Sequence, residues 1–250
     1  SVLDRNIPIQ FETALSDIIA EDGKVVGVTV SQNGQSKNIQ VKKGLILAAG
    51  GFEHNQELRD KYLPKPTNTE WSAGARGNQG DALQASLKLG AKTRLMNGAW
   101  WTTTLCVPDE PVPRLSIMEK SFPGSCVVNK NGERFANESQ NYMAFQKELF
   151  KAHSEDNPCA PAYHVFDARF RRNYIVGPMM TASMKPDWTI PKKWYDTGFV
   201  AKANTLRELA DNLGVNADGL EATVAKMNGY AQTGVDLDFH RGESEYDRYY

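Results

Sequence analysis

The sequence has few cysteines and no pattern that would use them in a scaffold or a metal site. Its three cysteines, Cys106, Cys126 and Cys159, are odd in number and show no C-x-x-C spacing. This excludes a disulfide framework that pairs all of them and favours a reducing, cytoplasmic location. The four histidines are far apart and form neither an H-x-x-x-H nor an H-E-x-x-H pair. We therefore predict no metal site.

Long hydrophobic runs and an excess of one charge are also absent. The apolar runs, such as residues 44–51, are far shorter than the roughly 20 residues that a membrane-spanning helix needs. The formal net charge is −1 at pH 7, and the basic residues are scattered. No electrostatic footprint for nucleic acid or an anionic membrane is present. We expect the partners to be small molecules or further copies of the chain, and the sequence leaves the oligomeric state open.

The chain has no initiating methionine. It begins at Ser1 and ends at Tyr249-Tyr250 without a cap, a glycine or a polar tail, so both ends look cut. We expect an interior fragment of a longer protein. Apolar residues make up 40% of the chain and charged residues 24%, which is ordinary for a globular protein. A length of 250 residues permits one or two domains.

The first part of the chain shows the two-residue period of strands. Strands are predicted at residues 9–20, 24–31 and 37–42. The turns between them, Glu21-Asp22-Gly23 and Asn33-Gly34, predict an antiparallel meander. The meander leads into the apolar stretch at residues 45–49, which we interpret as a buried strand.

Near residue 98 the sequence changes character, with Trp100-Trp101 and a proline-rich loop at residues 107–113. Beyond it, strands are predicted at residues 125–129, 133–136 and 162–167, the first two joined by an Asn-Gly turn. Helices are predicted at residues 55–63, 81–89, 140–153, 205–213 and 218–230. The predicted fold class is α+β, with a meander and helices followed by an antiparallel sheet flanked by helices.

Two glycines follow the predicted buried strand, in Ala48-Ala49-Gly50-Gly51-Phe52. Glycine lets a backbone approach an extended ligand more closely than any residue with a Cβ atom. A tight strand-to-helix turn explains the pair equally simply, so the glycines alone do not identify a site. The spaced glycines of residues 74–80 follow no strand and fit no dinucleotide fingerprint. We interpret them as the loop before the helix at Asp81.

A longer pattern runs from Phe122 to Tyr142 and combines the hairpin with Arg134-Phe135-Ala136-Asn137-Glu138. Together with Ala-Ala-Gly-Gly, it resembles the flavoprotein superfamily of fumarate reductase and succinate dehydrogenase. Fumarate reductases carry Asn-Glu-x-x-x-Arg-Asp here, with an arginine as the proton donor. Because this chain has Tyr142 and Met143 instead, we expect no fumarate reduction.

Tyr142, together with Ala99-Trp100-Trp101 upstream and residues 235–242 downstream, resembles the 3-ketosteroid Δ1-dehydrogenases along nearly the whole chain. The resemblance implies FAD as cofactor, an apolar 3-ketosteroid as substrate, and CH–CH oxidoreductase chemistry. Tyr142 would be the base that removes a proton from C2 while FAD accepts hydride from C1. Residues 1–98 would be the carboxyl-side portion of an FAD-binding domain, and residues 99–250 the substrate-binding domain.

The resemblance also implies ligand contacts. The cofactor contacts are Ala14, Ala48, Ala49, Gly50, Gly51 and Phe52, and the substrate contacts are Met118 and Phe122. The pattern alone favours Tyr142 as a helix residue packed beside Phe145 and Leu149, and the resemblance reverses that preference. We interpret Trp100-Trp101 as core packing at a domain boundary.

Several groups of the family, including the Gly-rich phosphate loop, have no counterpart in this sequence. We therefore expect the fragment to bind FAD weakly or not at all and to be inactive alone. Two alternatives stay open. The chain could belong to a related FAD-dependent enone reductase or Δ4-ketosteroid dehydrogenase, or it could be a non-catalytic module that binds an apolar ligand.

Overall fold

A computed structural model of the chain describes residues 3–249. The chain forms two compact units. The first unit contains the residues up to Leu63 together with Gly74–Asn97, and the second contains Pro64–Ala73 together with the residues from Gly98 onward. Among residues 3–249, no helix combines the length and the apolar character that crossing a bilayer requires.

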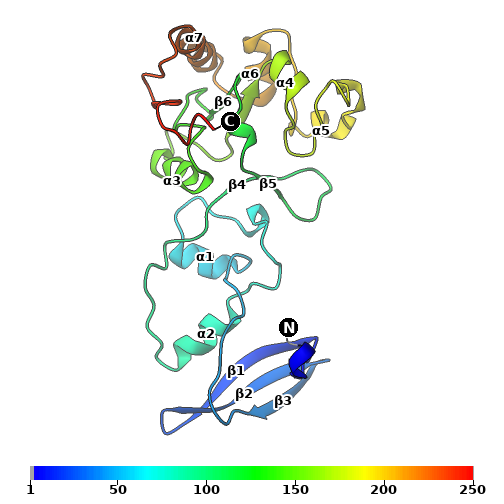
Figure 1. The fold of residues 1–250 in the computed structure, drawn as a ribbon, viewed down its shortest axis with the longest axis vertical. Coiled ribbons are helices and arrows are strands. Elements are labelled where there is room, and N and C mark those ends of the chain that lie inside the picture. The colour runs from blue at the N-terminus through cyan, green and yellow to red at the C-terminus, as the bar shows by residue number, and fades with distance from the viewer. Residues whose placement is uncertain (1–2, 250) are drawn as a thin grey trace. The chain divides into compact units, whose positions relative to one another are not determined.

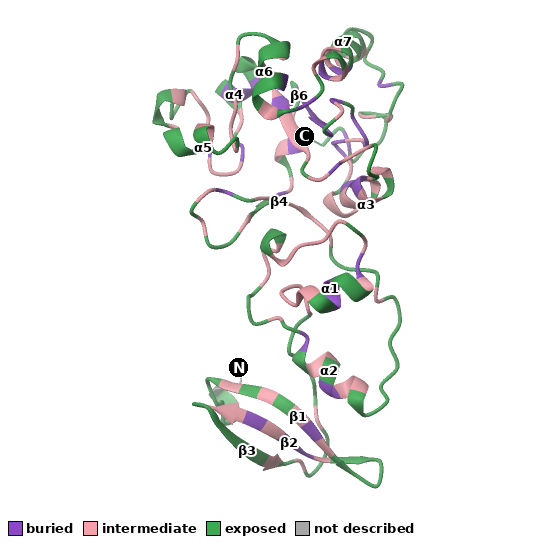
Figure 2. Cartoon of the chain, turned by 180° about the vertical axis from the view of Figure 1, so that it is seen from behind, coloured by how far each residue is buried: buried purple, intermediate pink, exposed green. Residues whose placement is uncertain are grey.

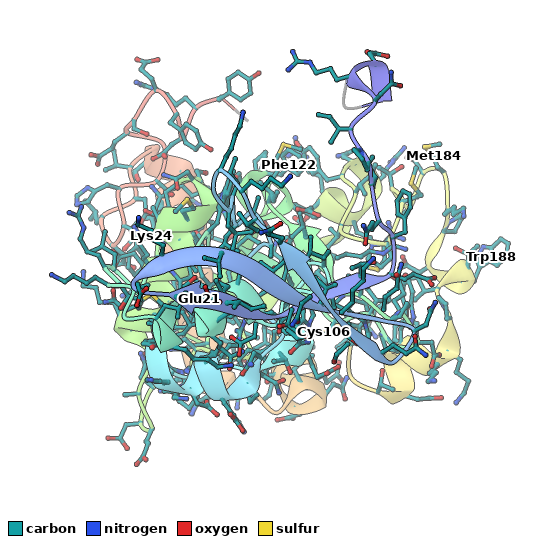
Figure 3. The ribbon with its side chains drawn as sticks, turned by 90° about the horizontal axis from the view of Figure 1, so that it is seen from below. Glu21, Lys24, Cys106, Phe122, Met184 and Trp188 are labelled. Carbon is teal, nitrogen blue, oxygen red and sulfur yellow. The ribbon has the colours of Figure 1, made fainter. Side chains whose placement is uncertain are left out.

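The first unit is built on the antiparallel meander that the sequence predicts (Figure 1). Its elements are β1 (Thr13–Glu21), β2 (Lys24–Gln32), β3 (Gln35–Gln40), α1 (Gln56–Tyr62) and α2 (Asp81–Lys88), with a 3-10 turn at Leu3–Arg5. Both residues of the Asp22-Gly23 turn and of the Asn33-Gly34 turn have positive φ, as two-residue hairpin turns of this kind require. Glu21 and Lys24 pair across the first turn (Figure 3).

Two parts of the predicted strand region are not strands. β1 begins at Thr13, so the alternation predicted from Ile9 onward is wrong there, and Phe11 is 77% exposed. The buried strand predicted at residues 45–49 is also wrong, because the segment pairs with no strand among residues 3–249 and Ile46 is 91% exposed (Figure 2). A strand needs a neighbour for its backbone hydrogen bonds, and an apolar run does not supply one.

The second unit combines small antiparallel sheets with helices (Figure 1). Its strands are β4 (Thr103–Leu105), β5 (Arg114–Ser116), β6 (Ser125–Val128) and β7 (Tyr163–Phe166), and its helices are α3 (Tyr142–Ala152), α4 (Ala168–Asn173), α5 (Lys192–Asp196), α6 (Leu206–Leu213) and α7 (Ala217–Thr233). Three 3-10 turns lie at Thr69–Trp71, Glu119–Ser121 and Asp187–Thr189. β4 pairs with β5, and β6 with β7.

β6 separates two layers of the core, because successive residues of a strand face opposite sides. Cys126 and Val128 join Leu220 in a cluster with residues of α6 and α7. Val127 lies in a second cluster with Phe145 of α3. All four residues of β6 are buried (purple in Figure 2). The predicted α+β class, with an antiparallel sheet flanked by helices, is confirmed.

The longer predicted helices are confirmed as α1, α2, α3, α6 and α7, with small shifts at their ends. The predicted caps of α6 are also present: Thr205 Oγ1 accepts a hydrogen bond from Glu208 N, and Gly214 ends the helix with a φ of 66°. α4 and α5 have no predicted counterpart, because such short helices contain too few buried residues to show a helical period.

The return strand predicted at residues 133–136 is wrong except for one bridge to β6 at Arg134. The Asn-Gly turn itself is present, and Asn129 Oδ1 accepts hydrogen bonds from two of its backbone amides. Beyond the turn, Phe135 packs against Phe145 with ring centroids 5.4 Å apart. Phe135 and Phe145 share a core cluster with Val127 of β6, so this segment packs against the strand by side chains and not as a further strand.

The Asn-Gly turn sits against the start of α7, which predicts a steric sensitivity at Gly132. Its φ is 76°, and a Cβ atom there would collide with backbone atoms of Asn216 and Leu220. Gly234 also has a φ of 76° but has open space around it. We expect Gly234→Ala to cost about 1 kcal/mol, the cost of a left-handed backbone alone, and Gly132→Ala about 3 kcal/mol in total. Urea unfolding followed by tryptophan fluorescence measures both, and equal losses would contradict the packing.

Candidate functional site

The Ala48–Gly51 segment is exposed and has no regular structure. The structure requires a glycine at one of the two positions. Gly50 has a φ of 75°, and a Cβ atom on it would collide with the Asn78 side chain. A Cβ atom on Gly51 would lie 2.7 Å from Glu53 Oε2, which is the end of a flexible side chain and can move. Local structure thus explains Gly50 without a ligand and does not explain Gly51. FAD contacts at these residues, and at Ala14 in β1, stay predictions.

The glycine loop of residues 74–80 is held against this segment by hydrogen bonds. Asn78 Nδ2 donates to Glu53 Oε1 at 2.5 Å, and His54 N donates to Asn78 O at 3.1 Å. Gly80 precedes α2 with a φ of 82°. The interpretation of this loop as the entry to the Asp81 helix is confirmed.

The residues at the glycine segment are compatible with an extended ligand such as FAD. No backbone hydrogen bond to another backbone group involves residues 44–51, within the described chain. Their N–H groups are therefore available, and Ala48, Ala49 and the glycines add little side-chain bulk. Unpaired backbone N–H groups are a common way to bind phosphate oxygens. Phe52, which follows them, packs against Tyr62 with ring centroids 5.9 Å apart.

Tyr142 is the first residue of α3 and is less buried than the core residues of the helix. Phe145 and Leu149 are 1% and 5% exposed and pack in the core, whereas Tyr142 is only half-buried. By its spacing Tyr142 lies on the same face of α3 as these two residues, but at the end of the helix it is less deeply buried than they are. Asn141 caps the helix by accepting a hydrogen bond from Ala144 N at 3.0 Å, so the cap fixes where the helix begins.

The phenol of Tyr142 has a partner that the sequence analysis assigned to the core. Trp100 Nε1 donates a hydrogen bond to Tyr142 Oη at 2.9 Å. Trp100 is 79% exposed, so its interpretation as core packing is wrong. Trp101 is partly buried and contacts Phe150 of α3 edge-on, with ring centroids 4.8 Å apart. An adjacent pair of tryptophans carries no signal that tells which ring points inward.

The two residues predicted to contact substrate flank the 3-10 turn Glu119–Ser121. Met118 is 47% exposed. Phe122 is half-buried, and one face of its ring stacks on Tyr174 at 4.7 Å between centroids. Their contacts with substrate stay predictions.

Lys120, between Met118 and Phe122, connects this turn to the start of α3. Its Nζ donates to Glu138 O at 2.7 Å and to Gln140 O at 2.8 Å, and it lies 4.9 Å from the centre of the Phe145 ring. The residue that precedes Tyr142 by two positions is therefore tied to the turn that carries Met118. This contact of Lys120 could not be predicted from the sequence, because a single lysine in a loop is usually solvated.

A network of buried charges includes Glu138, whose backbone carbonyl binds Lys120. Arg134 forms two hydrogen bonds with Glu138, at 2.7 and 2.8 Å, and two with Asp236, at 2.8 and 3.1 Å. Glu138 is fully buried and also accepts a hydrogen bond from Val127 N. Arg241 lies 3.5 Å from Glu138 and donates to Ser139 Oγ. The Arg-Phe-x-Asn-Glu motif thus supplies two members of a structural network.

The network favours the charged forms of Arg134 and Asp236. Burial alone would lower the pKa of Arg134, but the hydrogen bonds with Glu138 and Asp236 outweigh burial and raise it. Burial would raise the pKa of Asp236, but the hydrogen bond from Arg134 lowers it. Two cations and two carboxylates balance in charge, which is the condition under which buried ions are tolerated.

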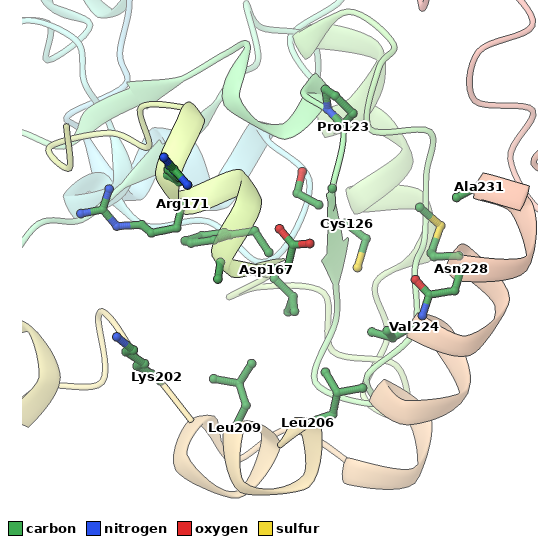
Figure 4. A pocket seen from close by; sticks show the side chains of 18 of the residues that line it. Pro123, Cys126, Asp167, Arg171, Lys202, Leu206, Leu209, Val224, Asn228 and Ala231 are labelled. Atoms are coloured by element: carbon green, nitrogen blue, oxygen red, sulfur yellow. The ribbon is translucent and has the colours of Figure 1, made fainter. Parts of the chain in front are cut away.

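A cavity of about 980 Å³ lies in the second unit beside this network, and Ser139, Asp236 and Arg241 are among its lining residues (Figure 4). Apolar side chains of α6 and α7, including Leu206, Leu209 and Val224, form one wall. Arg171 and Lys202 line another part and both pair with Asp187, at 3.1 and 2.6 Å. Tyr142 does not line this cavity. Within residues 3–249, no group of three metal-binding side chains occurs.

Comparison with known protein families places the whole chain in one family. The family model described as "FAD binding domain" matches residues 1–250. The chain therefore belongs to the FAD binding domain family. The resemblance to a flavoprotein superfamily, inferred from the sequence motifs, is confirmed.

Within this family the chain is similar to ketosteroid dehydrogenases. It is 41% identical to the 3-oxosteroid 1-dehydrogenase of Mycolicibacterium smegmatis over 99% of this chain and 44% of that protein. The crystal structure of the 3-ketosteroid Δ1-dehydrogenase of Sterolibacterium denitrificans in complex with 1,4-androstadiene-3,17-dione is 39% identical, with a TM-score of 0.93 over 99% of this chain and 44% of that one. The chain thus spans less than half the length of these relatives.

A third relative is named for a ketone that is smaller than a steroid. The 4-oxocyclohexanecarboxylate 2-dehydrogenase of Sinomonas cyclohexanicum is 35% identical over 92% of this chain and 38% of that protein. The similarity therefore extends to proteins whose named substrates are not steroids.

The buried charge network predicts a large difference between two glutamate substitutions. Glu138→Gln weakens the pairing of a buried arginine, so we expect it to lower the free energy of unfolding by about 3–5 kcal/mol. Glu148→Gln removes the exposed pair of Glu148 with Lys151, at 3.2 Å, and is expected to cost at most about 1 kcal/mol. Urea unfolding of both variants checks this, and a cost for Glu138→Gln no larger than that of the control would refute it.

Lys120 predicts a pH dependence of stability. Burial lowers the pKa of Lys120 to about 8, although the carboxylate of Glu138 partly opposes the shift, whereas an unfolded lysine titrates near about 10.4. Between these values the unfolded chain binds more protons, so this residue makes stability rise with pH. We expect the stability of wild type, relative to Lys120→Met, to increase between about pH 7.5 and about pH 9.5. A difference that stays constant in urea unfolding would contradict the assignment.

Proposed function

We propose that this chain is part of a flavoprotein that dehydrogenates a 3-ketosteroid between C1 and C2. The observation that carries the proposal is the Tyr142 phenol, which is the first side chain of α3 and is held at its oxygen by Trp100. The group that accepts the proton is the phenolate form of this side chain, and an N–H donor at its oxygen stabilises the negative charge of that form. The similarity to 3-oxosteroid 1-dehydrogenases supports the same reaction.

In the proposed reaction Tyr142 Oη takes the proton from C2, and a double bond forms between C1 and C2. The neighbouring C3 carbonyl acidifies the C2–H bond, which is why a weak base suffices. When bound, FAD supplies the acceptor for the hydride from C1. Met118 and Phe122 are proposed to contact the steroid, and their turn is tied to the start of α3 through Lys120.

We further propose that residues 1–98 are the carboxyl-side portion of an FAD-binding domain and residues 99–250 the substrate-binding domain. Ala48, Ala49, Gly50 and Gly51 would present their backbone N–H groups to FAD, with Ala14 and Phe52 as further contacts. Since the chain spans 44% of its steroid-dehydrogenase relatives, the 250-residue chain alone is proposed to hold FAD weakly or not at all and to lack activity.

A second candidate within the same chemistry is dehydrogenation of a smaller cyclic ketone. The similarity to 4-oxocyclohexanecarboxylate 2-dehydrogenase favours it, because the step needs only a carbonyl next to the C–H bond that ionises. A non-catalytic function, in which the chain only binds an apolar ligand, finds support in the cavity of the second unit, which falls within the usual volume of small-molecule sites.

The test uses the full-length flavoprotein with its FAD. We expect Tyr142→Phe to keep the FAD content of wild type and to lower kcat for 3-ketosteroid dehydrogenation by about 10²- to 10⁴-fold, the usual contribution of a general base. Tyr163→Phe, in β7, is the matched control and should keep wild-type activity. Dye-coupled turnover and anaerobic bleaching of FAD absorbance measure the effect.

The outcomes separate the candidates. Turnover of cyclic ketone carboxylates without turnover of 3-ketosteroids would replace the steroid by the smaller substrate. Wild-type turnover by Tyr142→Phe would remove this phenol from the reaction. Steroid binding without any bleaching of FAD would support the non-catalytic candidate.

A further inference from the structure

Tyr142 stands at the amino end of α3, where the described residues enclose its side chain only in part. It is the first residue of α3, it is half-buried, and its neighbours on the buried face begin at Phe145. A base must hold its oxygen in one place to meet a C–H bond, because misplacement by about 1 Å can cost a hundredfold in rate. A group outside α3 is therefore needed to hold the phenol.

Trp100 is placed to do this. Its indole N–H donates to Tyr142 Oη at 2.9 Å, which is a normal hydrogen-bond distance. Its neighbour Trp101 packs edge-on against Phe150 of the same helix, at 4.8 Å between ring centroids. The ring of Trp101 thus packs against α3, and the ring of Trp100 contacts the Tyr142 phenol.

The chemistry of the two side chains gives the hydrogen bond a direction. An indole N–H donates and cannot accept, so Trp100 can only occupy a lone pair of the phenol oxygen. It leaves the phenol proton free to depart and remains a donor when the oxygen is negative. Tyr142 is also at the amino end of an 11-residue helix, where the backbone dipole favours negative charge.

We propose that Trp100 is the positioning residue of Tyr142, which fixes the phenol oxygen and stabilises its phenolate form through the indole N–H. This inference rests on the proposed function of Tyr142 as the base. It adds a residue that does not itself touch the substrate in this role, and it assigns the role to the N–H group and not to the aromatic ring.

The test compares Trp100→Phe with Trp188→Phe in the full-length flavoprotein. Trp100→Phe keeps an aromatic ring and deletes the N–H group. Trp188 is 85% exposed and lies in the 3-10 turn Asp187–Thr189, where its side chain points away from the ribbon (Figure 3). It is therefore a control of equal chemistry and similar exposure. The probe is tyrosine labelled with ¹³C at Cζ, and the Tyr142 signal is the one missing from Tyr142→Phe.

We expect Trp100→Phe to move the pH midpoint of the Tyr142 signal upward by about half a unit to one unit, the size of one net hydrogen bond. Trp188→Phe should leave the midpoint unchanged. An unchanged midpoint in Trp100→Phe would overturn the proposal, since a ring that only packs does not discriminate phenol from phenolate.

A second measurement keeps Trp100 in place and covers a failure of Trp100→Phe to fold. In wild type the indole ¹H–¹⁵N signal of Trp100 should move with pH at the Tyr142 midpoint, and in Tyr142→Phe it should not. An indole signal that does not respond to the phenol would also overturn the proposal.

Turnover separates this inference from the proposed function. If 3-ketosteroids are turned over, Trp100→Phe should lower kcat about three- to tenfold at neutral pH with little change in KM, and should shift the acid limb of the kcat profile upward with the NMR midpoint. If the NMR midpoint shifts but no ketone is turned over, the hydrogen bond is upheld and the proposed function fails.

Discussion

The bidentate pair between Arg134 and Glu138 is the constraint on which the second unit depends. Both side chains are buried, and Asp236 completes the pairing of the arginine from a loop about a hundred residues further along the chain. A buried ion without its partner is far more costly than a buried apolar residue. The pair therefore fixes which loops come together, because the network is satisfied in only one arrangement of them.

The candidate base depends on this network through the backbone. The side-chain carboxylate of Glu138 accepts a hydrogen bond from the backbone N–H of Val127 in β6. Its backbone carbonyl accepts one from Lys120 Nζ. Both the side chain and the backbone of Glu138 thus hold the segment between the hairpin and α3 in place. Asn141 then caps the helix. Tyr142 is the next residue. The contacts of Glu138 and Asn141 therefore determine where its backbone lies. Among residues 3–249, Trp100 donates a hydrogen bond to the phenol oxygen itself.

Features that repeat a local sequence pattern could be predicted. Features that depend on a contact with a distant part of the chain could not. The meander, its turns and the amphipathic helices repeat a local pattern, so residues such as Asn33-Gly34 and Thr205 indicated them correctly. The stretch at residues 45–49 is apolar enough for a strand, but pairing decides strands and is not encoded locally. Likewise, the direction of each ring in Trp100-Trp101 depends on Phe150 and Tyr142, which lie more than forty positions away along the chain.

The motif that identifies the family is structural, and this limits what it says about substrates. Arg134 is hydrogen-bonded to Glu138 and to Asp236. The paired groups of Arg134 and Glu138 are therefore not available to a ligand. A signature of this kind is shared by any member that keeps the same arrangement of loops, whatever its substrate. This is consistent with a comparable similarity to a steroid dehydrogenase and to a dehydrogenase of a monocyclic ketone. We propose that specificity comes from residues beside the network, such as the exposed Met118 and the half-buried Tyr142.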